Sequence, residues 1–80
     1  MKARVTIFYK DSVFDPQGNT LAQSLRRVGF GKVGEVRVGK VVDLQLSHSS
    51  RSEAEGDLRK MCEELLANPV IEAYQYEIQG

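Results

Sequence analysis

The sequence predicts an α+β domain, an antiparallel sheet with two helices on one face and elements in the order β-α-β-β-α-β. Near both ends of the chain, apolar residues alternate with their neighbours, which is the period-two pattern of strands. Two inner stretches place apolar residues three or four apart, as amphipathic helices do. No repeat, linker or low-complexity tract interrupts the 80 residues. We therefore expect a single domain over residues 1–80.

The composition excludes several functions. The 11 Lys+Arg balance 11 Asp+Glu, so no surplus of positive charge draws the chain to nucleic acid or to an anionic membrane. No apolar run approaches the ~20 residues that span a bilayer, and the N-terminus has no signal-peptide pattern. We expect a cytoplasmic protein with neither nucleic acid nor a membrane as its partner.

The cysteine and histidine counts exclude the usual supports of a small fold. The single Cys62 cannot form an internal disulfide, and with the single His48 it cannot build a structural zinc site from Cys and His alone. A chain near this length buries only about 60 to 65% of its unfolded surface. Partner chains are therefore the expected support.

The first strand and helix are predicted from local patterns. Residues 2–10 alternate, with Ala3, Val5, Ile7 and Tyr9 on one face. A helix is expected over residues 16–28, with Asp15 as its N-cap and Pro16 at its first position. The apolar stripe of this helix comprises Leu21, Ala22, Leu25 and Val28. We expect the helix to end at Gly29 in a left-handed conformation, with Phe30 packing back on it.

A hairpin is expected next. The apolar segments 33–38 and 41–46 are separated by Gly39-Lys40, a pair suited to a type II′ turn. With that turn, Val36, Val38 and Val41 share one face, and Val33, Val42, Leu44 and Leu46 share the other. Since both faces are apolar, we expect each to be covered.

The second helix and the last strand complete the pattern. Ser52 and Glu55 have the spacing of a capping box, and an apolar stripe follows at Ala54, Leu58, Met61, Cys62 and Leu65. Asn68-Pro69 ends this helix, and residues 70–78 alternate as a strand. The simplest arrangement of these elements is ferredoxin-like.

No catalytic constellation is evident. Residues 29–34 match G-x-G-x-x-G, but the match closes a helix instead of opening one, so no helix N-terminus faces a phosphate. His48 is expected to be a solvated loop residue, and Cys62 a buried, unreactive one with a raised pKa. Glu63 and Glu64 are adjacent and diverge around the helix, so they form no paired-carboxylate site.

Other proteins with this fold fit poorly. An acylphosphatase needs an Arg in the loop after the first strand, and residues 11–18 contain none. An RNA-binding sheet needs paired aromatics on its open face, where only Phe8 is expected.

A set of polar residues at loops and strand ends remains without a catalytic partner. Arg37 and Lys40 flank the expected turn, where two cations could dock into an acidic or carbonyl-rich groove of a partner. Each member also fits a cap, a turn or a surface charge. The set comprises Lys10, Asp11, Asp15, Gln17, Gly18, Arg37, Lys40, Asn68 and Glu72.

Four segments, taken in order, resemble one family. They are Asp-Pro-Gln-Gly at 15–18, Val-Gly-Phe at 28–30, Val-Arg-Val-Gly-Lys at 36–40 and Leu-Leu-Ala-Asn-Pro-Val-Ile-Glu at 65–72. Together they resemble PurS, the small subunit of phosphoribosylformylglycinamidine (FGAM) synthase. The resemblance covers almost the whole chain, although the serine-rich loop 47–52 carries no family signature.

The resemblance implies a function in purine biosynthesis. PurS-like chains have no active site of their own and are subunits of a glutamine-dependent, ATP-consuming carbon–nitrogen ligase. They bridge a glutaminase subunit and a large synthetase subunit and assist ammonia transfer for the amidation of formylglycinamide ribonucleotide. They form homodimers or homotetramers. The implied cofactors, ATP and Mg, are used by the synthetase partner, and none is bound by this chain.

The resemblance also implies a set of partner-contact or shape-determining residues. We expect the glycines and the proline to act through backbone geometry and the charged residues through interface pairing. These residues are Asp15, Gln17, Gly18, Arg37, Gly39, Lys40, Asn68, Pro69 and Glu72. Two alternatives remain open: a ferredoxin-like homo-oligomeric module that binds a small metabolite, and a small independent enzyme.

Overall fold

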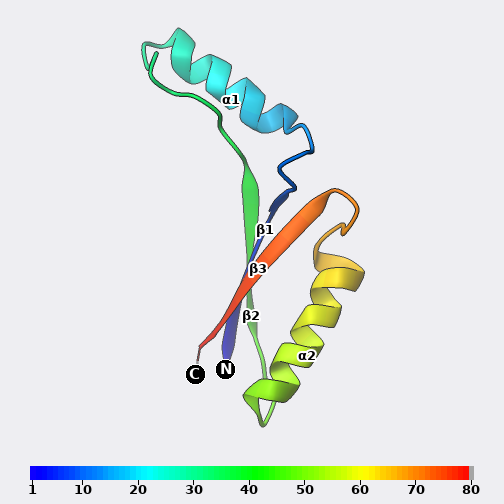
Figure 1. Cartoon of the computed structure of the whole chain (residues 1–80). Helices are drawn as coiled ribbons and strands as arrows, with labels where there is room; N and C mark the ends of the chain where they lie inside the picture. Colours follow the sequence, from blue (N-terminus) through cyan, green and yellow to red (C-terminus); the bar gives the residue numbers. More distant parts are fainter. Residues whose placement is uncertain (80) are drawn as a thin grey trace.

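The computed structural model describes residues 1–79 and confirms the α+β class with an antiparallel sheet (Figure 1). The strand β1 forms the centre of a three-stranded sheet in the order β2-β1-β3, and both of its pairings are antiparallel. In chain order the elements are β1 (Lys2–Tyr9), α1 (Pro16–Arg27), β2 (Gly39–Gln45), α2 (Arg51–Met61), the π-helix η1 (Cys62–Leu66) and β3 (Glu72–Gln79).

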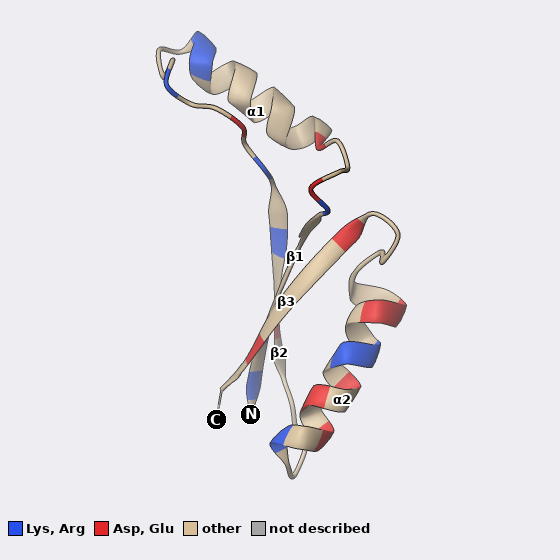
Figure 2. Cartoon of the chain, in the orientation of Figure 1, with Lys and Arg blue, Asp and Glu red and all other residues tan. Residues whose placement is uncertain are grey.

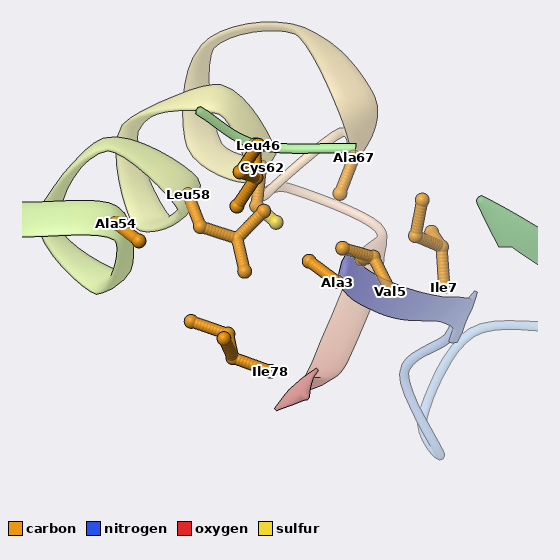
Figure 3. Packing of buried hydrophobic residues seen from close by; sticks show 9 residues of the cluster. All are labelled: Ala3, Val5, Ile7, Leu46, Ala54, Leu58, Cys62, Ala67 and Ile78. Carbon is orange, nitrogen blue, oxygen red and sulfur yellow. The ribbon is translucent and has the colours of Figure 1, made fainter. Parts of the chain in front are cut away.

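One face of the sheet carries the core (Figure 3). The alternation in β1 is confirmed, since Ala3, Val5 and Ile7 are buried. Val5 lies opposite Val42 on β2 and Tyr76 on β3. The helix α2 covers this face with its buried side chains, and the cluster is completed by Leu46, Ala54, Leu58, Cys62, Ala67 and Ile78.

The expected hairpin is wrong. Gly39 and Lys40 are the first residues of β2 and make no turn, and residues 33–38 belong to no strand. The described chain therefore has three strands instead of four. A Gly-Lys pair permits a tight turn without requiring one, and here residues 34–38 continue away from the sheet toward α1 (Figure 1).

The expected placement of both helices on one face is also wrong. α2 runs alongside the sheet, whereas α1 projects beyond its end (Figure 1). The chain measures 51 × 26 × 14 Å. Its radius of gyration is 16.1 Å, against about 12 Å for a compact chain of this length. We call residues 11–38, which comprise α1 and its two connectors to the sheet, the arm.

The caps of α1 are confirmed, but Phe30 does not pack back on the helix as expected, since it is 59% exposed. Asp15 is the N-cap and Pro16 follows it. Gly29 has φ of 115°, and its N–H donates to the Arg26 carbonyl while that of Phe30 donates to the Leu25 carbonyl. These two bonds form a Schellman motif.

The start of α2 differs from the expected one. Ser50, not Ser52, is the N-cap, and its Oγ accepts from the Glu53 N–H at 3.2 Å. Ser49 Oγ also donates to the Glu53 carboxylate at 3.3 Å. Ser50 and Ser52 each have a glutamate three residues later, so the spacing alone does not distinguish them. With the helix beginning at Arg51, the side chain of Arg51 pairs with Glu55 one turn on at 3.5 Å.

The end of α2 explains a third difference. The Ala67 N–H donates to the Cys62 carbonyl at 2.9 Å, an i→i+5 bond that widens the last turn. Leu65, expected on the apolar stripe, is therefore rotated outward and is 84% exposed. Within residues 1–79 no helix combines the length and the apolar character that crossing a membrane requires.

Candidate functional site

The buried carboxylate of Asp15 joins the start of α1 to the connector that leads into β2. Its Oδ1 accepts from the Gly18 N–H at 2.9 Å, and its Oδ2 accepts from the Val38 N–H at 2.7 Å. Only 4% of Asp15 is exposed. One side chain therefore caps a helix and also ties together two segments that are 23 residues apart in the sequence.

The same hydrogen bonds keep Asp15 ionised. The N–H groups of Val38 and Gly18 lower the pKa of the carboxyl below its ordinary value, against the opposing effect of burial, and the positive charge of Arg37 lowers it further. Donors aimed at a carboxylate favour its charged form. At neutral pH Asp15 is a fixed negative charge inside the base of the arm.

Gly18 and Gly39 lie where the backbone comes close to another segment. A Cβ at Gly18 would sit 2.1 Å from the Val36 carbonyl oxygen. A Cβ at Gly39 would sit 2.7 Å from the Ile7 carbonyl oxygen. A carbonyl of a packed segment cannot withdraw as a flexible side chain would, so both positions require glycine.

The side chain of Arg37 is directed into its own chain. Its Nη2 donates to the carbonyls of Tyr9 at 3.1 Å and Lys10 at 2.8 Å. Its Nη1 donates to the Val13 carbonyl at 3.3 Å and pairs with Glu35 at 3.3 Å. The guanidinium therefore links the two connectors of the arm.

Gln17, Gly39, Lys40 and Glu72 come together around a small cavity. This cavity has a volume of about 180 Å³ and is completed by Ile7, Phe8, Tyr9 and Val38. Its walls combine an amide, an ammonium and a carboxylate with apolar side chains.

Asn68, Pro69 and Glu72 form the turn between η1 and β3. The Asn68 N–H donates to Glu72 Oε1 at 2.7 Å, and the Val70 N–H donates to Asn68 Oδ1 at 3.1 Å. The N–H of Glu72 also donates to the Asn68 carbonyl at 2.7 Å. Because this turn occupies residues 68–71, the last strand begins at Glu72, two residues later than expected.

Pro69 and Glu72 also line a second cavity, of about 470 Å³, behind the turn. Cys62 lies in its wall and is completely buried. Burial, together with the negative charge of Glu63, raises the pKa of its thiol, as expected. The Tyr74 hydroxyl donates to Glu63 at 3.4 Å, and burial and this carboxylate raise the pKa of Tyr74.

All nine expected site residues lie at one end of the sheet. Phe8 pairs with Gly39 and Tyr9 pairs with Glu72, so the last residues of β1 bring the start of β2 and the start of β3 together. The remaining members join them through the arm and through the 68–71 turn. We call this region the junction; it comprises Asp15, Gln17, Gly18, Arg37, Gly39, Lys40, Asn68, Pro69 and Glu72.

The sequence reasoning missed the acceptors at the junction. They are backbone carbonyls of Tyr9, Lys10 and Val13, and no residue type marks them. It also missed a cavity of about 390 Å³ between α1 and its connectors, lined in part by Val13, Phe14 and Val36. The apolar character of these residues was the one feature of the sequence that could have indicated this cavity.

His48 is not the solvated loop residue that was expected. Its Nε2 lies 2.7 Å from Asp57 Oδ2, and only 17% of its side chain is exposed. This pair fixes the loop 46–50 against α2, at the far end of the sheet from the junction. Among residues 1–79, no group of three His, Cys, Asp or Glu residues could hold a metal ion.

Comparison with known proteins places the chain among a single set of relatives. The family model for "PurS: Phosphoribosylformylglycinamidine (FGAM) synthase" matches residues 2–80. The PurS subunit of phosphoribosylformylglycinamidine synthase from Bacillus subtilis is 40% identical over 78 residues, which are 98% of this chain and 92% of that protein. The corresponding subunit from Archaeoglobus fulgidus is 45% identical over 74 residues, 92% of each chain.

Solved structures agree in fold. A crystal structure of Bacillus subtilis PurS has a TM-score of 0.91 at 39% identity and covers 99% of this chain and 98% of that one. A chain in the structure of PurLQS from Thermotoga maritima has a TM-score of 0.87 at 34% identity, with 95% and 93% covered.

Proposed function

The chain belongs to the PurS family, the FGAM synthase subunits of purine biosynthesis, and from this premise we propose that it is a non-catalytic subunit that bridges a glutaminase and a synthetase. In this proposal the chain assists ammonia transfer for the ATP-dependent amidation of formylglycinamide ribonucleotide. ATP and Mg are used by the synthetase partner, in the cytoplasm. The observation that carries the proposal is the arm, because a chain of this shape exposes surfaces that only other chains can cover.

The exposed apolar side chains support an assembly. Phe14 is 69% exposed, Val28 70% and Phe30 59%, and all three belong to the arm. Val41, on the strand that continues from the arm, is 57% exposed. Apolar residues gathered on one projecting element are typical of a surface that is buried by association.

We propose that the first such association is a homodimer formed by exchange of the arms. The sheet order makes β2 an edge strand, and residues 34–38 run on from it in an extended conformation without strand partners among residues 1–79. If residues 34–38 of a second copy pair with β2, its α1 can lie beside α2. Each half then regains the fourth strand and second helix that the sequence predicts, and exchange of an identical element costs little.

Lengthening the link between the arm and β2 tests the exchange. Three flexible residues inserted between Gly39 and Lys40 should let residues 33–38 fold back on β2 of their own chain, which gives a monomer in sedimentation equilibrium. The same insertion between Gly31 and Lys32, at the tip of the arm, is the matched control and should leave a dimer. A dimer from both variants would contradict the exchange.

Two chemically different surfaces support the bridging role. The arm exposes the apolar side chains of Phe14, Val28 and Phe30, and its helix α1 has no acidic residue but ends in Arg26 and Arg27. The helix α2 and η1 carry five acidic residues against three basic ones, and Glu53, Glu63 and Glu64 among them are exposed (Figure 2). Surfaces of unlike chemistry select unlike partners, as a chain between two different subunits requires.

Reconstitution tests this role. Purified synthetase and glutaminase subunits are mixed with and without this chain, and their co-elution is followed by size-exclusion chromatography. We expect a joint complex only when the chain is present. If the two large subunits associate equally well without it, the bridging role is wrong, and a homo-oligomeric module that binds a small metabolite becomes the better description.

A further inference from the structure

The arm is attached to the sheet by two connectors, residues 11–15 and 28–38. Two flexible connectors of this length would leave α1 free to swing, since the sheet ends at Tyr9 and begins again at Gly39. The direction of the arm therefore depends on what links one connector to the other. Among the hydrogen bonds of the described chain, the side chains of Asp15 and Arg37 make these links.

The two links differ in what they hold. Asp15 joins the start of α1 to the Val38 N–H, so it fixes the helix to the returning connector. Arg37 lies on the returning connector and donates to the carbonyls of Tyr9 and Lys10, where β1 ends. Among the side-chain hydrogen bonds of residues 1–79, only the one from Arg37 to the Tyr9 carbonyl joins the arm to a strand of the sheet.

The guanidinium suits this task because of its shape. It presents five N–H donors in a rigid plane, and four acceptors lie within 2.8 to 3.3 Å of its two terminal nitrogens. A lysine ammonium has the same charge but carries its three donors on one nitrogen at the end of a flexible stem, so it cannot span the same set of acceptors. The side chain of Arg37 is 31% exposed, and both of its terminal nitrogens donate within the chain.

We propose that Arg37 is a positioning residue that sets the direction of the arm relative to the sheet, and that it acts inside its own chain without pairing with a partner subunit. The expected effect of Arg37 on dimer affinity rests on the proposed homodimer. An arm held in one direction is preorganised for exchange, whereas a swinging arm must be ordered when the second copy binds, at a cost in affinity.

Single-molecule fluorescence energy transfer tests the positioning directly. Dyes are attached at Gln23→Cys on α1 and Gln45→Cys on β2, both at exposed positions, while the buried Cys62 is left unlabelled. At picomolar chain concentration each molecule is observed alone. We expect a narrow distribution of transfer efficiencies for the unmodified chain and a broad one for Arg37→Ala and for Arg37→Lys.

Arg27→Ala is the matched control, because Arg27 is an exposed arginine at the other end of the same arm and should leave the distribution narrow. A broad distribution in the otherwise unmodified chain, or a narrow one in Arg37→Ala, would overturn the proposal. Since neither the synthetase nor the glutaminase takes part, failure here is distinct from failure of the bridging role.

Sedimentation equilibrium tests the consequence. Arg37→Ala and Arg37→Lys should each weaken the homodimer by roughly tenfold, the ratio set by about 1.4 kcal/mol, and Arg27→Ala should not. If Arg37→Lys dimerises like the unmodified chain, its charge and not its fork of donors is what matters, and the positioning role is refuted.

Discussion

At the scale of single residues, the junction is held together by hydrogen bonds between side chains and backbone groups that lie far apart in the sequence. Asp15 accepts from the Val38 N–H, and Arg37 donates to the carbonyls of Tyr9, Lys10 and Val13. We expect these residues to act on the shape of their own chain, since their hydrogen bonds are made within it.

Asp15→Asn should destabilise the protein. The amide oxygen of asparagine can still cap α1 at Gly18, but its NH₂ group would face the Val38 N–H, so that donor would meet donor. We expect a lower midpoint of thermal unfolding at fixed chain concentration and neutral pH. Asp11→Asn is the matched control, since Asp11 is exposed on the same connector, and it should leave the midpoint unchanged.

The effect of Asp15 should depend on pH. The pKa of Asp15 is lowered in the folded chain from its ordinary value of 3.8, so its stabilising contribution is complete above that value and is lost as pH falls through the lowered one. The difference in midpoint between the unmodified chain and Asp15→Asn should therefore be constant above about pH 5 and shrink below 3.8. A difference that grows on acidification would show that the carboxylate is not the stabilising form.

Gly18→Ala should be destabilising although alanine favours helices. The new Cβ would lie 2.1 Å from the Val36 carbonyl oxygen, so α1 must move away from its connector, at a cost of roughly 1–3 kcal/mol. Gly56→Ala is the control, because Gly56 lies inside α2 with no neighbour within 4 Å, and it should gain about 1 kcal/mol. Equal effects in urea denaturation would contradict the close approach.

The sequence predicted part of this residue-level detail. The cap at Asp15, the proline after it and the left-handed Gly29 follow from local rules that concern three or four neighbouring residues. The role of Arg37 could not be predicted in this way, because its acceptors lie 24 to 28 residues away and are backbone carbonyls. The resemblance singled out Arg37, but for pairing with a partner.

At the scale of elements, the first turn of α2 offers a test of its start. Ser50→Ala removes the Oγ that accepts from the Glu53 N–H and should cost about 1 kcal/mol of unfolding free energy. Ser52→Ala is the control, since Ser52 lies within the first turn of the helix, where alanine is at least as favourable. If urea denaturation shows a larger loss of unfolding free energy for Ser52→Ala than for Ser50→Ala, the helix begins at the capping box that the sequence predicted.

The missing hairpin shows where local signals end. The apolar pattern of residues 33–38 and 41–46 is compatible with a hairpin and also with one long strand whose two halves serve different sheets. Turn chemistry permits a hairpin at Gly39 but does not exclude a continuous extended segment. Contacts with the rest of the fold decide between the two arrangements. The outward rotation of Leu65 could not be predicted from the sequence either, because a π-helical turn has no clear sequence signal.

At the scale of the whole molecule, the chain has an open and elongated shape. Its core lies on one face of three strands, its arm projects from one end, and its longest dimension is 51 Å. A small domain usually needs added support, and in the proposed dimer the exposed apolar residues of the arm receive it from a second chain. The sequence already led us to expect partner chains, because a chain with one cysteine cannot form an internal disulfide. The open shape agrees with that expectation.

The most direct test of the coupling role is product formation by purified synthetase and glutaminase subunits, with and without this chain, using first glutamine and then ammonium as the nitrogen donor. The account predicts that omitting the chain abolishes only the glutamine-driven rate, because ammonium supplied from solution needs no transfer between subunits. Equal glutamine-driven rates with and without the chain would contradict it.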